Sequence, residues 1–158
     1  MSVMEGTNLV TKQEEENKSH ILEEGCKLLF LFLFGGMVYY FMEILFRDYS
    51  HVSMIICGGL SFVLIGALNE GDRDYSVLSQ MVIGAGIITT LEFITGVIVN
   101  LILHLNVWDY SLEPYNLMGQ VCLAYSNLWF LLSFLCIVLD DFIRSFVFGE
   151  PKVTYRWL

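Results

Sequence analysis

Glu92 is the residue whose type and position could do chemistry in this chain. It lies midway along an apolar run from Val77 to Leu105, in which the only other ionisable side chain is His104. As a helix this run would be roughly 44 Å long, enough to cross a hydrocarbon core of about 30 Å. A carboxylate at that depth must be protonated, hydrogen-bonded or turned to a wet cavity. Glu92 is therefore a candidate for a proton or substrate pathway, and the alternative is a structural hydrogen bond to a Tyr or Ser of a neighbouring helix.

Small and polar residues recur at steps of three or four along the same run. They are Ala85, Thr89, Glu92, Gly96 and Asn100. This spacing places them on one face of a helix, while Ile87, Leu91 and Ile98 fall on another. We expect the face of small and polar residues to point into protein rather than lipid. Asn100 therefore joins Glu92 as a candidate residue of a polar pathway.

A second acidic residue, Glu43, precedes Arg47 by four positions near the end of the first apolar segment. On a helix this spacing predicts an ion pair. Two interpretations remain open for the pair: a salt bridge that reaches the membrane interface, or part of an inward-facing polar site. Turn-forming and interfacial aromatic residues gather after the long apolar run. The candidate site residues among them are Trp108, Asp109 and Asn116.

The composition determines the class of protein. Of 158 residues, 56% are hydrophobic and only 16% are charged. A soluble domain of this size has too little interior to bury so much apolar surface. We therefore predict an all-α integral membrane protein. The net charge is −9 without any basic cluster, which argues against nucleic-acid binding.

Four apolar segments predict a bundle of four transmembrane helices within a domain of residues 26–144. The expected spans are residues 28–46, 52–68, 77–105 and 120–139. A polar tail, residues 1–25, precedes this domain and is expected to be helical only near its end. A second tail, residues 145–158, follows it. Either Asp74 or Ser76 can cap the third helix.

The distribution of positive charge predicts the orientation. All Lys and Arg residues except Arg47 fall on one side of the expected bundle. They are Lys12, Lys18, Lys27, Arg73, Arg144, Lys152 and Arg156. By the positive-inside rule, both termini are expected in the cytoplasm and the loop that carries Trp108 outside.

No motif of a standard enzyme family is present in the sequence, so we predict that the protein is not an enzyme and uses no cofactor. The cysteines lack the spacing of metal ligands. A disulfide between Cys57 and Cys122 stays open, since both should lie in the outer half of the membrane. An intramembrane enzyme that uses Glu92 with Asp109 is the least favoured reading. Their carboxyl groups would be about 25 Å apart unless the loop folds back.

Two stretches together resemble a known family. They are LEFITG at residues 91–96 and WDYS at residues 108–111, followed by Pro114, Asn116, Gly119 and Cys122. This combination resembles the bacterial membrane proteins of the putative ABC transporter type IV family, also called CmpB-like permeases. The run EILFR at residues 43–47, with Ser50-His51 and Gly58-Gly59, is similar to one branch of it. The likeness extends over residues 28–144, although the second span lacks the Y-G-P stretch of other members.

The resemblance implies a multi-pass protein of the bacterial inner membrane that serves as a transporter component. The residues that it carries over are Glu43, Glu92, Trp108, Asp109 and Asn116. The expected partners are the lipid bilayer, further copies of the chain or other membrane subunits, and an ATPase subunit as a further candidate. The alternative function is a non-transporting accessory or holin-like pore protein, which the small size and short loops would also fit.

Overall fold

The computed structural model describes residues 2–70 and 75–157. Arg73 and Asp74, used above to predict orientation and helix capping, lie outside the described residues. The chain forms two compact units, residues 1–30 and residues 31–158.

The first unit consists of the N-terminal part of helix α1, which extends over Ser2–Arg47. The structure is thus helical from Ser2, where helix was expected only toward the end of the polar tail. Side chains from Lys12 onward are mostly exposed in this unit. Lys12 pairs with Glu16 at 3.9 Å, one turn away. Such pairs, together with the high helix propensity of Glu and Lys, favour a helix without burial.

Three helices in the described part of the chain are long and apolar enough to cross a membrane. They comprise Lys12–Arg47, Val52–Asn69 and Val77–Ile102. The predicted helical fold with four α-helices is confirmed. The fourth, α4 (Leu123–Val147), has 25 residues but is not one of these three.

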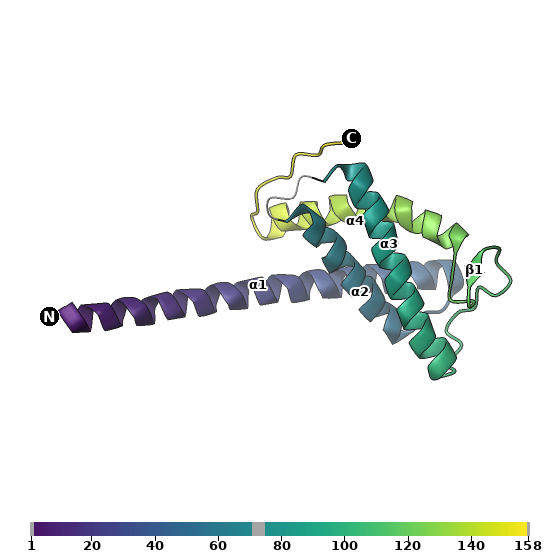
Figure 1. Ribbon diagram of the computed structural model, residues 1–158, viewed down its shortest axis with the longest axis horizontal. Coiled ribbons are helices and arrows are strands. Elements are labelled where there is room, and N and C mark those ends of the chain that lie inside the picture. Colours follow the sequence, from purple (N-terminus) through teal and green to yellow (C-terminus); the bar gives the residue numbers. More distant parts are fainter. Residues whose placement is uncertain (1, 71–74, 158) are drawn as a thin grey trace. The chain divides into compact units, whose positions relative to one another are not determined.

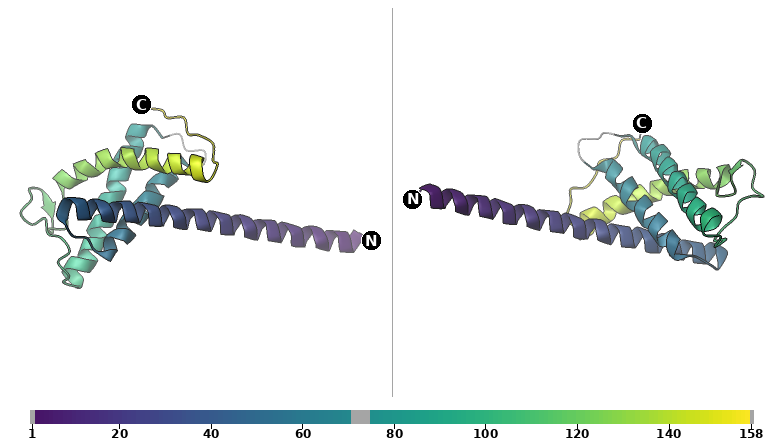
Figure 2. Two further views of the ribbon diagram at one scale, coloured as in Figure 1. Left: turned by 180° about the vertical axis from the view of Figure 1, so that it is seen from behind. Right: turned by 60° about the horizontal axis from the view of Figure 1, so that its bottom comes forward.

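The second unit holds the remaining elements. They are the C-terminal part of α1, α2 (Val52–Gly66), the 3₁₀ turn η1 (Ala67–Asn69), α3 (Val77–Gly96), the π-helix η2 (Val97–Ile102), β1 (Asn116–Leu117), β2 (Val121–Cys122) and α4. Helices α2 and α3 contact each other and cross α4 (Figures 1 and 2). The antiparallel hairpin β1–β2 directly precedes α4, so this helix begins later than the predicted residue 120.

Glycines bring α1 and α2 unusually close together. A Cβ atom added at Gly59 would lie only 2.6 Å from the backbone oxygen of Phe32, and one at Gly36 would collide with the backbone oxygen of Ile55. Close backbone approach through small residues is typical of helix pairs in membranes. This contact fixes the C-terminal part of α1 against the bundle, and thereby positions Glu43.

Ser76 caps the N-terminus of α3. Its side-chain oxygen accepts a hydrogen bond from the backbone N–H of Ser79 at 3.2 Å. Since the first N–H groups of a helix lack intrahelical partners, this bond satisfies one of them. The backbone N–H of Val77 has a partner that is distant in the sequence: it donates to the carbonyl of Arg156 at 2.7 Å. The segment after α4 therefore returns to the start of α3.

Candidate functional site

Glu92 is buried on α3, with 1% of its surface exposed. The indole N–H of Trp129, on α4, donates to its Oε2 atom at 2.7 Å. The hydroxyl of Tyr110, in the loop after η2, donates to its Oε1 atom at 3.2 Å. The expected inward direction of this side chain is confirmed. A tyrosine is one of its partners, as the structural alternative expected, and a tryptophan is the other.

Both donors to Glu92 are neutral groups. Burial, and next the negative charge of Glu92, raise the pKa of Tyr110 well above its ordinary value, so its phenol keeps the proton that it donates. No ion pair joins Glu92 to a Lys, Arg or His within residues 2–70 and 75–157. The carboxylate is thus hydrogen-bonded, but no Lys, Arg or His of the described chain lies within ion-pair distance of it.

The predicted ion pair between Glu43 and Arg47 is confirmed, with 2.9 Å between Oε1 and Nη1. The other oxygen of Glu43 accepts from the hydroxyl of Ser50 at 2.7 Å. Nη2 of Arg47 donates to the backbone oxygen of Val107 at 2.8 Å. The pair therefore ties the end of α1 to the loop after η2. The Glu43 side chain is buried and Arg47 is exposed, so both interpretations of the pair remain open.

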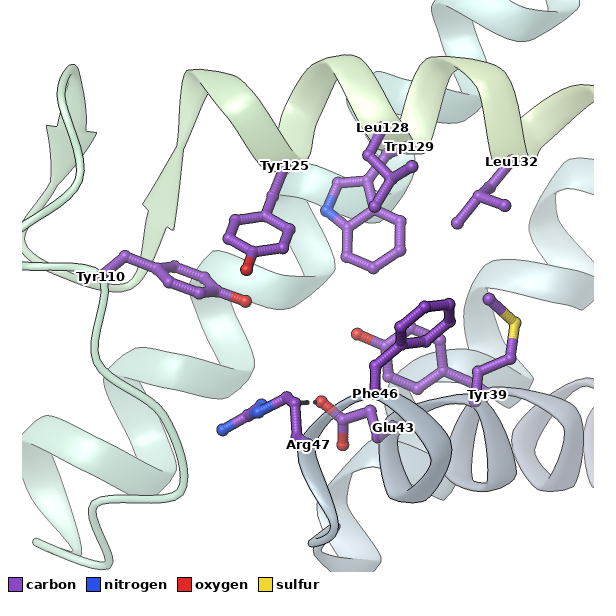
Figure 3. Close-up of a pocket in the computed structure, with 10 residues that line it drawn as sticks. Tyr39, Glu43, Phe46, Arg47, Tyr110, Tyr125, Leu128, Trp129 and Leu132 are labelled. Atoms are coloured by element: carbon purple, nitrogen blue, oxygen red, sulfur yellow. Dashed lines mark hydrogen bonds and ion pairs between the residues drawn. The ribbon is translucent and has the colours of Figure 1, made fainter.

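A cavity of about 260 Å³ lies between the end of α1, the Tyr110 loop and α4 (Figure 3). We call it the aromatic cavity. Its lining comprises Tyr39, Met42, Glu43, Phe46, Arg47, Tyr110, Tyr125, Leu128, Trp129 and Leu132. Figure 3 shows the hydroxyl groups of Tyr39, Tyr110 and Tyr125 turned toward this space. Because Tyr110 and Trp129 both line the cavity and bind Glu92, the buried carboxylate lies directly behind its wall.

Two ring pairs form much of this wall. Tyr110 stacks on Tyr125 with ring centroids 4.6 Å apart, and Tyr39 lies 5.7 Å from Trp129. Tyr39, Tyr110, Tyr125 and Trp129 are not among the site residues predicted from the sequence. For the three that lie on helices, an available signal was that Tyr and Trp inside an apolar helix need partners for their polar tips.

Asn100 and Trp108 belong to a neighbouring hydrogen-bond network. Asn100 donates to Oε1 of Gln120 at 2.9 Å and accepts from the backbone N–H of Val107 at 2.7 Å. The indole N–H of Trp108 donates to the backbone oxygen of Gln120 at 2.9 Å. Asn100 lies on the π-helix η2, an irregularity that often marks functional sites. Neither residue lines the aromatic cavity, and their contacts hold the loop in place.

Asp109 and Asn116 shape the loop and do not reach Glu92. Asp109 is exposed and accepts hydrogen bonds from the hydroxyl and then the backbone N–H of Ser111, which hold its pKa below the ordinary value. Asn116 accepts from the backbone N–H of Gly119 at 3.0 Å. The loop does fold back toward α3, but Tyr110 and not Asp109 reaches Glu92. The pairing that an enzyme using both carboxylates requires is therefore not found.

The disulfide that the sequence leaves open is not formed in the structure. Cys57 and Cys122 are both buried and both free.

The comparison with protein families bears on the same residues. The model of the family described as "Putative ABC-transporter type IV" matches residues 30–157. The chain belongs to this family. The resemblance seen in LEFITG and WDYS is thereby confirmed, and the match includes Glu92 and every residue of the aromatic cavity. Among curated proteins and among solved structures, none matches the chain.

Proposed function

We propose that this protein is the membrane-embedded permease component of a bacterial transporter, with Glu92 at the centre of its substrate or proton pathway. Membership of the ABC-transporter type IV family supports a role in transport. Three helices of sufficient length and apolarity support residence in a membrane. In this proposal α4 is the fourth span, the membrane is the inner membrane, and both termini are cytoplasmic.

The observation that carries the proposal is a buried carboxylate that forms no ion pair with the described residues and lies beside a cavity. An ionisable group at mid-depth in a bilayer costs at least about 2.5 kcal/mol, and such groups usually mark an ion or substrate pathway. Trp129 and Tyr110 satisfy the oxygens of Glu92 but supply no positive charge. A proton or a substrate can supply that charge, which is the behaviour that a transport site requires.

The proposal also assigns partners and excludes catalysis. The chain would assemble with further copies of itself or with other membrane subunits, and an ATPase subunit would bind on the side of the termini. Asp109 is exposed and bonded to Ser111, so it does not reach Glu92 to act with it. We therefore assign Glu92 to binding rather than to a chemical reaction.

Thiol labelling tests the proposed orientation. In a background without the four native cysteines, Leu112→Cys in the loop and Lys152→Cys after α4 both provide exposed positions. A membrane-impermeant reagent should label Leu112→Cys from outside the cell and Lys152→Cys only in inverted vesicles. Labelling of both positions from the same side would overturn the proposed topology.

Two variants of Glu92 test the proposed role in transport. Uptake or efflux would be followed in cells that express the wild type, Glu92→Gln or Glu92→Leu, and divided by the amount of each protein in the membrane. We expect Glu92→Gln to abolish transport, because it keeps the shape and a hydrogen-bond acceptor but cannot carry the charge. Wild-type transport by Glu92→Gln, with reduced expression of Glu92→Leu, would show that Glu92 is structural. Collapse of the membrane potential on expression would instead favour the holin-like alternative.

A further inference from the structure

We propose that the aromatic cavity binds a monovalent organic cation that carries apolar groups. The inference rests on the proposed transport function and names the class of substrate. Its basis is the combination of an unmatched negative charge, several aromatic rings around one space and a second apolar cavity next to it.

The charges around the cavity favour a cation. Glu43 and Arg47 line it and neutralise each other at 2.9 Å. The second nitrogen of Arg47 is already bonded to the backbone oxygen of Val107. Glu92, behind the wall, then remains as one uncompensated negative charge when it is ionised. A bound cation would take the place of the proton that Glu92 otherwise needs, whereas an anion would be repelled by it.

The aromatic rings favour a cation whose charge is shielded by carbon. Five of the lining residues are aromatic: Tyr39, Phe46, Tyr110, Tyr125 and Trp129. Ring faces attract weakly hydrated cations such as quaternary ammonium groups, which aromatic cages commonly bind. Tyr110 and Trp129 also donate hydrogen bonds to Glu92, which polarises both groups toward negative charge on their rings. The two hydrogen bonds thus make these rings of the cavity wall more attractive to a cation.

A second cavity gives room for an apolar substituent. It has about 230 Å³ and shares Tyr39, Met42, Trp129 and Leu132 with the aromatic cavity. The rest of its lining is almost entirely apolar and includes Phe62, Ile65, Leu135 and Leu139. A small inorganic cation would leave this space empty. A cation with a phenyl or alkyl group would fill both cavities.

Equilibrium binding to the purified full chain in lipid nanodiscs tests the inference. The probe is radiolabelled benzyltrimethylammonium, with its uncharged carbon isostere and benzenesulfonate as competitors. We expect the ammonium compound to bind at least about tenfold more tightly than the isostere, since a desolvated cation between rings gains this much or more. Benzenesulfonate should not compete.

Two substitutions at Tyr125 distinguish the contribution of its ring to cation binding from that of its hydroxyl. Tyr125 lines the cavity and makes no direct hydrogen bond to Glu92, whose donors are Tyr110 and Trp129. Tyr125→Phe keeps the ring face and should retain binding, while Tyr125→Leu should weaken it roughly tenfold. The matched control is Phe142→Leu, which removes an exposed ring of α4 outside both cavities. It should bind as the wild type does.

The outcomes separate this inference from the proposed function. Equal affinity for the cation and its isostere, or equal loss in Tyr125→Phe and Tyr125→Leu, would overturn the inference. Loss of cation binding in Glu92→Gln, in protein that elutes as the wild type does, would support it. Because the assay needs no energy source, cation binding without any transport would leave the inference standing and contradict the transport role. Transport that depends on Glu92, in protein that binds no cation, would support the transport role and overturn the inference.

Discussion

Two buried carboxylates, Glu92 on α3 and Asp140 on α4, are stabilised in opposite ways. Asp140 has no exposed surface and accepts a hydrogen bond from its own cation, Arg144, at 2.6 Å. Glu92 accepts only from the neutral groups of Trp129 and Tyr110. Removing one partner of a buried ion pair is strongly destabilising, because the other charge then stays buried without compensation. A buried carboxylate that forms no ion pair can be neutralised by a proton or a bound cation, as a transport site requires.

The Asp140 region also connects several segments of the chain. Arg144 is 4% exposed and reaches Glu70, just after η1, at 2.9 Å and Glu150, after α4, at 3.7 Å. Three carboxylates thus surround a single guanidinium group. Planar guanidinium with several donors is suited to this arrangement, and lysine would not replace it.

Asp141 adds neutral bonds to the same region. One of its oxygens accepts from the amide of Asn69 at 2.8 Å and from the hydroxyl of Tyr155 at 2.9 Å. Burial, and next the bond to Asp141, raise the pKa of Tyr155 above its ordinary value, so the phenol remains a donor. These contacts fasten the segment after α4 to the turn after α2. We therefore assign the region to holding elements together.

The largest effect is expected for Asp140→Ala. It should lower the free energy of unfolding by about 3–5 kcal/mol, because Arg144 would remain buried with less compensation. Unfolding by SDS in mixed detergent micelles measures the change. Lys152→Met, at an exposed position after α4, is the control and should stay within about 0.5 kcal/mol of the wild type.

A double variant sharpens this prediction. Replacing both partners, Asp140→Leu with Arg144→Met, removes the charge together with its cation. We expect most of the lost stability to return, since exchange of a whole buried pair for apolar groups is often neutral. Glu70 and Glu150 would lose their contacts with Arg144 but are less buried. A double variant as unstable as Asp140→Ala would contradict the description of this region as a matched pair.

Trp129→Phe is expected to have the next largest effect on the free energy of unfolding, measured in the same SDS assay. It removes the indole donor that lies 2.7 Å from Glu92. A hydrogen bond to a charged group contributes about 1.5–3 kcal/mol, against about 1 kcal/mol for a neutral one. The same substitution should therefore cost less in a Glu92→Gln background. Equal losses in both backgrounds would indicate that Glu92 carries no charge in the resting protein.

Gly66→Ala tests how tightly the Asp140 carboxylate is held. A Cβ atom at Gly66 would collide with that carboxylate, and such overpacking costs about 1–3 kcal/mol. Gly86→Ala is the matched control, because a Cβ at this helical position would meet no atom within 4 Å apart from its chain neighbours and its own helix backbone. It should stabilise α3 by about 0.5–1 kcal/mol. Loss of stability in both variants would point to a general intolerance of alanine instead of contact with Asp140.

Much of the fold follows from local features of the sequence. Apolar runs of sufficient length predict the helices, and Ser76 predicts the start of α3, because these signals depend on neighbours in the chain. The start of α4 is predicted too early. Gln120 to Cys122 form part of a hairpin whose strands need a partner from residues 116–117, and a hydropathy pattern does not contain that pairing.

The candidate site is predicted less completely than the fold. Helical spacing identifies Glu92 and pairs Glu43 with Arg47, since both depend on one helix. The approach of Tyr110 to Glu92 joins a loop to a helix 18 residues away, and spacing cannot predict such a contact. Asp109, one residue before Tyr110, is exposed instead. Tertiary folding of the loop decides which of the two adjacent residues faces the site.

The smallest effect on stability is expected for Glu92→Gln. The amide keeps an oxygen that can accept from Trp129, and it removes an uncompensated buried charge. We expect a change within about 1 kcal/mol of the wild type, in either direction, in the same SDS unfolding assay. Asp140→Asn, which also replaces a carboxylate by an amide, is the matched comparison and should cost more because it leaves Arg144 without its buried counter-charge. If Glu92→Gln were as destabilising as Asp140→Asn, both carboxylates would serve structure. The aromatic cavity would then lose the uncompensated charge on which its assignment depends.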